Sequence, residues 1–269
     1  METNKMASDK HTKTVFSGAL DEFFYGIAEL SQFAVNVFRE GFKPPYEFRE
    51  VLNQCYEIGI KSFMLVGLTA FILGLVLVMQ SRPTMIEFGA GSYLPAMSSI
   101  SIVREIGPLV TSLICAGKIG SGISAELGSM KVTEQIDAME VSGTNPFKYL
   151  VATRILATTL MIPILTVYAD FISLIGAFTG SNIKDDVNVN FYFNRVFEAL
   201  HYTDVIPSFT KTFFFGFTIG LVGCTKGYNS KKGTEGVGKA ANISVVVSMV
   251  GVIIIDMVVT QITSMLGYL

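Results

Sequence analysis

The sequence contains no tryptophan and comparatively little charge. Charged residues make up 16% of its 269 residues, against roughly 25% in soluble domains, whereas hydrophobic residues make up 50%. This composition excludes an ordinary soluble domain and predicts an integral membrane protein. The net charge of −2 at pH 7 gives no basic excess of the kind that binds nucleic acid, so we expect no nucleic-acid partner.

Cysteine and histidine are also scarce. The three cysteines, Cys55, Cys115 and Cys224, have neither the spacing of a disulfide framework nor that of a metal site. The two histidines, His11 and His201, belong to no credible serine–histidine–acid set. We therefore expect a chain that is not an enzyme and that holds no metal and no cofactor itself.

One segment has the glycine and lysine spacing of a nucleotide-binding P-loop, Gly233–Lys239. Ala240 stands where the hydroxyl that holds magnesium is needed, and an apolar segment follows at once. We therefore interpret the segment as a flexible, basic cytoplasmic loop and not as a nucleotide site.

Long apolar segments dominate residues 46–269. Each can cross a hydrocarbon core of roughly 30 Å, the first with the help of flanking turns. The sequence therefore predicts an all-α integral membrane protein with five transmembrane helices. The predicted spans are Phe63–Met79, Tyr93–Gly117, Arg154–Gly180, Val205–Gly223 and Ile243–Leu266.

The residues ahead of the first span have a different character. Residues 1–15 are polar and are expected to form a disordered cytoplasmic tail. Residues 16–45 alternate between apolar and polar positions at the helical period, and Gly41 and Pro44 end this pattern. We predict an interfacial amphipathic helix in the bilayer plane, with packing against the rest of the protein as the alternative.

Lysine and arginine gather in alternate loops, which predicts the orientation in the membrane. The loops on one side hold only Arg82, Lys184 and Arg195, whereas the N-terminal region and the remaining loops are rich in both residue types. Positively charged loops stay in the cytoplasm. We therefore expect a cytoplasmic N-terminus and, after five spans, a periplasmic C-terminus.

Five charged residues interrupt the predicted spans: Arg104, Glu105, Asp170, Lys211 and Asp256. Charge inside a membrane is costly and persists mainly where it is paired or lines a cavity. Lys211 and Asp256 lie on antiparallel spans, so they can meet, either as a structural ion pair or as the lining of a polar cavity. Arg104 and Glu105 project about 100° apart on a helix, so at least one must face another helix, a ligand or water.

Small residues recur every four positions at Ala116, Gly120, Ser124 and Gly128. This spacing lets helix backbones approach closely, which implies tight packing within the bundle or across a homodimer.

A short amphipathic helix is predicted next, inside the cytoplasmic segment 118–150. Thr133 is its expected N-cap, and Glu134 and Asp137 occupy its first turn. Ile136 lies on a narrow apolar edge that could fill a groove on a partner, although a solvated loop remains the alternative.

Four stretches between residues 104 and 146 form a specific pattern. They are Arg-Glu-Ile-Gly-Pro (104–108), Ala-Gly-Lys-Ile-Gly-Ser (116–121), residues 125–140 and Asn-Pro (145–146). In these stretches the sequence resembles the MlaE permease family, the membrane subunits of ABC transporters that move phospholipids between bacterial membranes. The resemblance runs from about Glu47 to the C-terminus. It implies a multi-pass protein of the bacterial inner membrane that maintains outer-membrane lipid asymmetry.

The resemblance also implies partners. They are a second copy of the chain, a cytoplasmic ATPase dimer that binds ATP and magnesium, a periplasmic ring of MCE-domain protein and, as an optional subunit, a STAS-domain protein. The phospholipid pocket would lie at the dimer interface. By motif, Arg104 and Glu105 carry over as substrate-binding residues; Lys211 and Asp256 carry over from a part of the sequence where the resemblance is looser. The implied ATPase-coupling residues are Glu126, Met130, Thr133, Glu134, Ile136 and Asp137.

Two alternatives stay open at the level of sequence. One is the same machine with another apolar cargo, such as a sterol. The other is an ion-coupled secondary transporter that uses Asp170 and Asp256 as proton sites, although no inverted internal repeat is visible to support it.

Overall fold

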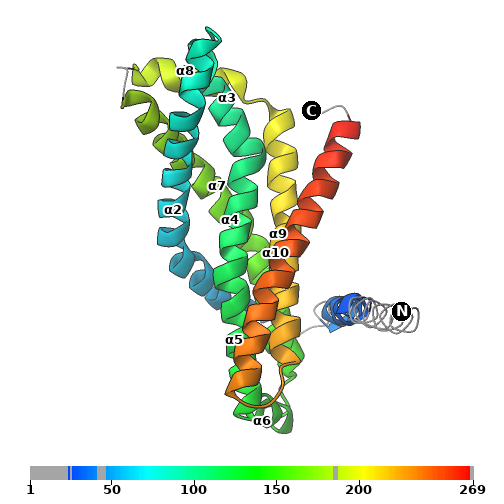
Figure 1. The fold of residues 1–269 in the computed structure, drawn as a ribbon. Helices are drawn as coiled ribbons and strands as arrows, with labels where there is room; N and C mark the ends of the chain where they lie inside the picture. Colours follow the sequence, from blue (N-terminus) through cyan, green and yellow to red (C-terminus); the bar gives the residue numbers. More distant parts are fainter. Residues whose placement is uncertain (1–23, 25, 41–46, 184–186, 267–269) are drawn as a thin grey trace, which may run out of the picture. The chain divides into compact units, whose positions relative to one another are not determined.

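The computed structural model describes residue 24 and residues 26–40, 47–183 and 187–266 (Figure 1). The chain forms two units, residues 1–46 and 47–269, which are considered separately. In the first unit, residues 26–40 are helical, as predicted. The expected tail at residues 1–15 lies outside the described residues, and the interfacial placement of the helix stays a prediction.

The second unit confirms the predicted all-α fold. Within the described residues it holds five helical segments long and apolar enough to cross a membrane. Three are α2 (Phe48–Glu87), α9 (Tyr202–Tyr228) and α10 (Thr234–Met265). The other two, Gly91–Val132 and Phe147–Asn182, are continuous helices built from several pieces. Every span is longer than its predicted apolar run, because a helix continues past the hydrocarbon core into polar sequence.

The segment Gly91–Val132 changes its helical winding several times. It consists of η1 (Gly91–Tyr93), α3 (Leu94–Ser101), η2 (Ile102–Ile106), α4 (Gly107–Cys115), η3 (Ala116–Gly120) and α5 (Ser121–Val132). Both η2 and η3 are π-helical turns. Such turns insert extra backbone into a helix, redirect its side chains and are frequent at functional sites. The π turn η2 carries the charged pair predicted as substrate-binding.

Glycine permits the closest helix contacts in the bundle. A Cβ on Gly74 of α2 would collide with the backbone of Ser173 in α7 (Thr153–Asn182), and one on Gly176 of α7 would collide with the backbone of Phe71. The two helices therefore meet backbone to backbone, as small residues allow in membranes.

The ladder of small residues that the sequence predicted packs inside the bundle. Ala116, Gly120, Ser124 and Gly128 are all buried within this single chain. A Cβ on Gly227 of α9 would press on the backbone carbonyl of Ser124, and Ser244 of α10 donates to Gly120 O at 3.2 Å. Of the two interpretations of the ladder, packing within the bundle is confirmed.

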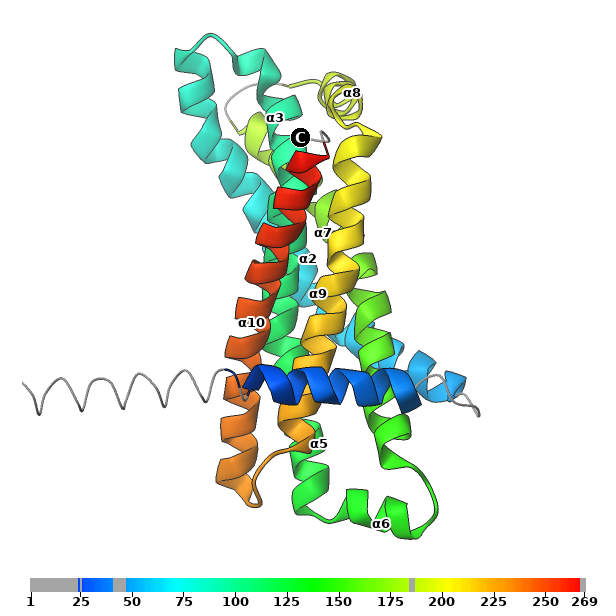
Figure 2. The same cartoon turned by 90° about the vertical axis from the view of Figure 1, so that its right-hand side faces the viewer.

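The two ends of the bundle carry different short helices (Figure 2). At one end, α6 (Gln135–Val141) lies between the second and third spans, and η4 (Phe147–Ala152) begins the third span. At the other, α8 (Val189–Ala199) lies between the third and fourth spans, at the same end of the bundle as the last turns of α10. These are called the α6 end and the α8 end.

No sequence prediction covered α8. Its Tyr192 and Val196 are fully buried in a cluster with Leu94, Ile102 and Ala177. Burial raises the pKa of the Tyr192 hydroxyl. The helix therefore covers the α8 end of the spans immediately beside the π turn η2.

Candidate functional site

Lys211 of α9 is the centre of a charged cluster inside the bundle. Its Nζ lies 2.8 Å from Oε2 of Glu105 in η2 and 2.8 Å from Oδ1 of Asp256 in α10. The Lys211 side chain is 3% exposed and that of Asp256 is 10% exposed, whereas Glu105 is 40% exposed. The predicted meeting of Lys211 and Asp256 is confirmed, and Glu105 joins them.

Arg104 turns away from this cluster and bonds a different carboxylate. Its Nε donates to Oδ1 of Asp204 at 3.1 Å, and its terminal nitrogen contacts the same oxygen. Asp204 is almost fully buried, and its Oδ2 also accepts the backbone N–H of His201 at 3.1 Å. The expectation that at least one of Arg104 and Glu105 faces another helix is confirmed, because Arg104 bonds Asp204 and Glu105 bonds Lys211.

Asp204 was not among the residues predicted for the site. It lies in the polar stretch just ahead of the expected fourth span, where an acidic residue is common. A local sequence pattern could have identified it. An aspartate three residues after His201 is well placed to accept an amide at the start of a helix.

The π turn η2 is fastened to α9 by a further contact. Ser208 Oγ donates to the carbonyl of Val103 at 2.6 Å, and both groups are buried. A π turn departs from the regular hydrogen-bond ladder, so a neighbouring hydroxyl can bond a carbonyl there. Three contacts from α9, made by Asp204, Ser208 and Lys211, thus fix the orientation of Arg104 and Glu105.

A small cavity of about 30 Å³ opens among these side chains. Arg104, Glu105, Asp204 and Lys211 line one side, and Val259 of α10 contributes apolar surface. Such a volume holds no more than a few water molecules. A single chain therefore presents the charged side chains but leaves no room for a large ligand among them.

Asp170 of α7 lies apart from the ion pairs. Among the described residues its Oδ1 is buried without a hydrogen-bond partner. It occupies the space beside Gly107, because a Cβ on that glycine would collide with this oxygen. The glycine of the Arg-Glu-Ile-Gly-Pro motif is thus required by a close approach of α4 and α7.

The predicted N-cap of the short helix is wrong. The hydroxyl of Thr133 donates back to Ser129 O at 2.9 Å, which closes the last turn of α5. The helix α6 begins one residue later, after Glu134, whose φ of 58° is left-handed. The reason is that α5 continues through Val132, so Thr133 ends one helix instead of beginning the next.

The residues predicted to couple to the ATPase differ in accessibility. Thr133, Glu134 and Asp137 are exposed, whereas Ile136 is 4% exposed and Met130 is half-buried. Ile136 thus anchors α6 to the permease and leaves the charged face outward. The coupling role itself stays a prediction.

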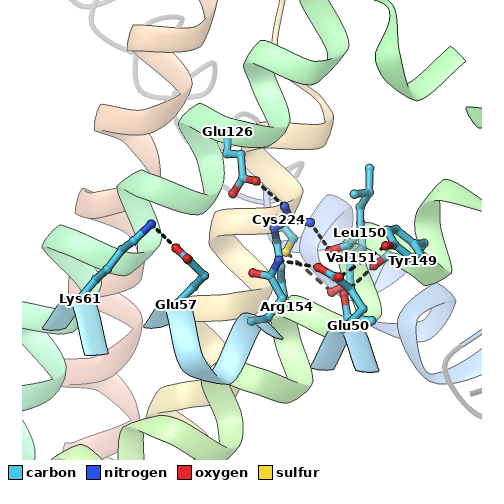
Figure 3. Close-up of polar contacts among 11 residues, drawn as sticks. Glu50, Glu57, Lys61, Glu126, Tyr149, Leu150, Val151, Arg154 and Cys224 are labelled. Atoms are coloured by element: carbon cyan, nitrogen blue, oxygen red, sulfur yellow. Dashed lines mark hydrogen bonds and ion pairs between the residues drawn. The ribbon is translucent and has the colours of Figure 1, made fainter. Parts of the chain in front are cut away.

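The sixth of these residues, Glu126, belongs to a polar network around Arg154 (Figure 3). The buried Arg154 guanidinium donates to Glu126 Oε1 at 2.7 Å and to the carbonyl of Leu150 at 2.9 Å. The sequence placed Arg154 only at the head of the third span. Arg154 in fact bonds both α5 and η4. It therefore connects the helix that precedes α6 in the sequence with the helix that follows it.

A bundle of membrane-spanning helices around a charged, partly exposed cluster defines the class of a polytopic membrane transport subunit. Residues 51–262 match the family model described as Permease MlaE, and the chain belongs to this family.

The curated relatives agree. A probable ABC transporter permease protein of Rickettsia prowazekii is 34% identical over 89% of this chain and 93% of its own length. One of Synechocystis is 34% identical over 77% of this chain and 78% of its own. The chloroplastic protein trigalactosyldiacylglycerol 1 of Arabidopsis thaliana is 29% identical over 81% of this chain and 63% of its own.

The chain is therefore a multi-pass ABC transporter permease subunit, a transport component and not an enzyme. An ABC permease works with an ATPase partner. This membership disfavours the alternative of an ion-coupled secondary transporter, and Asp256, one of the two residues assigned to that alternative, is already paired with Lys211.

Proposed function

We propose that this permease moves glycerophospholipid between the inner and outer membranes of a bacterium and so maintains outer-membrane lipid asymmetry. The observation that carries the proposal is the pair of adjacent, half-exposed charges, Arg104 and Glu105, held within an apolar bundle. The Arabidopsis relative, whose name contains that of a diacylglycerol lipid, supports a lipid cargo.

The chemistry of the pair suits a lipid headgroup. Arginine presents a planar fork of donors that matches phosphate oxygens. Asp204 accepts from Nε and one terminal nitrogen of Arg104. The Arg104 side chain nevertheless remains 36% exposed. Glu105 can accept hydrogen bonds from an amine or hydroxyl on the same headgroup. A sterol offers a single hydroxyl, which can bond only one of these two side chains at a time, so phospholipid is the better fit.

The proposed assembly has several subunits, and the small cavity of the site supports one part of it, a second copy of the chain. Because the cavity in one chain is only about 30 Å³, we propose that a second copy completes the lipid pocket. The ATPase dimer would dock at the α6 end, where Glu134 and Asp137 are exposed. The MCE ring would lie at the α8 end, and a STAS-domain subunit is an optional partner of the ATPase. We propose that the protein lies in a bacterial inner membrane with the α6 end in the cytoplasm, an orientation that the distribution of Lys and Arg supports.

The experiment that tests this function is transport by the whole complex in proteoliposomes, with mass spectrometry of the lipids that co-purify with it. Arg104→Ala removes the proposed phosphate contact, and we expect roughly tenfold or more slower ATP-dependent lipid transport while the complex still assembles. Lys232→Ala, an exposed lysine at the α6 end, is the matched control. Co-purification of a sterol in place of phospholipid would contradict the proposed cargo.

A further inference from the structure

A second charged cleft lies at the α6 end of the bundle and shares no residue with the Lys211 cluster. It opens between α2 on one side and η3 and α5 on the other, with a volume of about 270 Å³. Two lysines, Lys61 and Lys118, and two glutamates, Glu57 and Glu126, line it. Its size approaches the roughly 300 Å³ at which small-molecule sites begin.

The charges in this cleft do not cancel. Lys61 and Glu57 form an ion pair one helical turn apart on α2. Glu126 is bonded at 2.7 Å to the buried Arg154, which is not among the residues that line the cleft (Figure 3). Among the described residues, Lys118 has no ion-pair partner. Both carboxylates are therefore neutralised, and the cleft keeps one surplus ammonium group.

The two lysines lie at the same boundary of the apolar layer. Lys61 lies two residues before the apolar run Phe63–Met79, and Lys118 directly follows the run Tyr93–Gly117. Because both line one cleft, their ammonium groups mark a single depth, the level at which lipid phosphates meet the hydrocarbon core.

An exposed apolar surface continues from the cleft toward the middle of the membrane. Met64 and Leu68 lie three and seven residues after Lys61, so they share its face of α2. Met64 is 82% exposed and Leu68 is 58% exposed in the chain. A charged cleft followed by an apolar face is complementary to a phosphate headgroup followed by acyl chains.

We propose that this cleft binds the phosphate of a phospholipid in the bilayer leaflet at the α6 end, as a loading position separate from the Arg104 site. Lys118 and Lys61 hold the phosphate, and the acyl chains lie along Met64 and Leu68. This inference rests on the proposed function, because a loading position has a purpose only if the permease carries lipid.

Gly122 offers a probe inside the cleft. It lines the cleft, is exposed, and a Cβ there would meet no atom within 4 Å. Because a Cβ has space there, Gly122 is a suitable position for the photoreactive amino acid benzoylphenylalanine. Gly238 of α10 is equally exposed and open and serves as the matched control position.

The test uses the whole complex in nanodiscs of phosphatidylethanolamine and phosphatidylglycerol, with cross-linked products identified by mass spectrometry. We expect phospholipid adducts several-fold more abundant at Gly122 than at Gly238. Lys61→Gln and Lys118→Gln should each lower the Gly122 adduct roughly fivefold. Lys239→Gln, a loss of an exposed lysine outside the cleft, should not change it.

Three results would overturn the inference. Equal adducts at both glycines would mean general contact with the bilayer, and adducts insensitive to Lys61→Gln and Lys118→Gln would exclude recognition of phosphate. Adducts with a partner protein would show that the cleft is a subunit interface.

ATP-driven lipid transport, measured in the same preparation, separates this inference from the proposed function. If the unsubstituted complex moves no lipid, the proposed function fails and the loading role fails with it. If transport is normal and Gly122 shows no preference, only the cleft assignment fails.

Discussion

Removing Lys211 is the sharpest perturbation of the charged cluster. In Lys211→Met, Asp256 and Glu105 lose the ammonium group that lies 2.8 Å from each of them. Breaking a buried ion pair by removing one partner costs about 3–5 kcal/mol, since the remaining charge stays buried and unpaired. Glu105 is 40% exposed and recovers some hydration, so we expect the low end, about 3 kcal/mol.

The assay is the free energy of unfolding of the assembled complex in mixed detergent micelles. The double variant Lys211→Met/Asp256→Leu removes the buried pair together, and we expect it to be less unstable than Lys211→Met alone. Lys232→Met, at an exposed lysine, should change stability by less than about 0.5 kcal/mol. A Lys211→Met complex as stable as that control, or a double variant as unstable as the single one, would refute the reasoning.

Two further perturbations test other contacts. Gly107→Val drives a side chain into Asp170, and we expect a loss of about 1–3 kcal/mol in unfolding free energy, partly recovered when Asp170→Ala is added; no recovery would show that the collision lies elsewhere. Glu134→Lys and Ile136→Asp should weaken co-purification of the ATPase, the first at the docking face and the second by loosening α6. Retention of the ATPase at normal affinity in both variants would contradict the coupling assignment.

The parts of the site that the sequence predicted are those where a single charge interrupts an apolar run. Lys211 and Asp256 stand out because charge is costly in a membrane, and antiparallel spans bring them to similar depth. Arg104 and Glu105 stand out for the same reason. Their separate directions follow from helical geometry, which does not say which residues they meet.

The missed parts depend on geometry that composition does not record. Asp204 is an ordinary polar residue ahead of a span until α9 brings it to Arg104. The π turn in η2 has no simple sequence pattern. The sequence placed Arg154 at the start of the third span, where a charged residue is expected to be exposed, but Arg154 is buried. Each becomes visible only when distant segments are packed together.

The fold, like the site, has features that the sequence predicts and features that it does not. Hydropathy finds the apolar middle of each span but not its ends, so α2 extends from Phe48 to Glu87 around a predicted run of 17 residues. The short helix α8 escaped because its burial partners, such as Leu94 and Ala177, lie far from it in sequence. Thr133 was predicted to begin α6, but it ends α5. A threonine can cap a new helix or bond back to the previous turn, and local sequence does not decide between the two.

The most direct test of the central claim is lipid movement by the purified permease with and without its ATPase partner in proteoliposomes. The account predicts phospholipid transport only when the ATPase and ATP are both present, and none by the permease alone under a proton gradient. Transport at the full rate by the permease alone, with or without such a gradient, would contradict it.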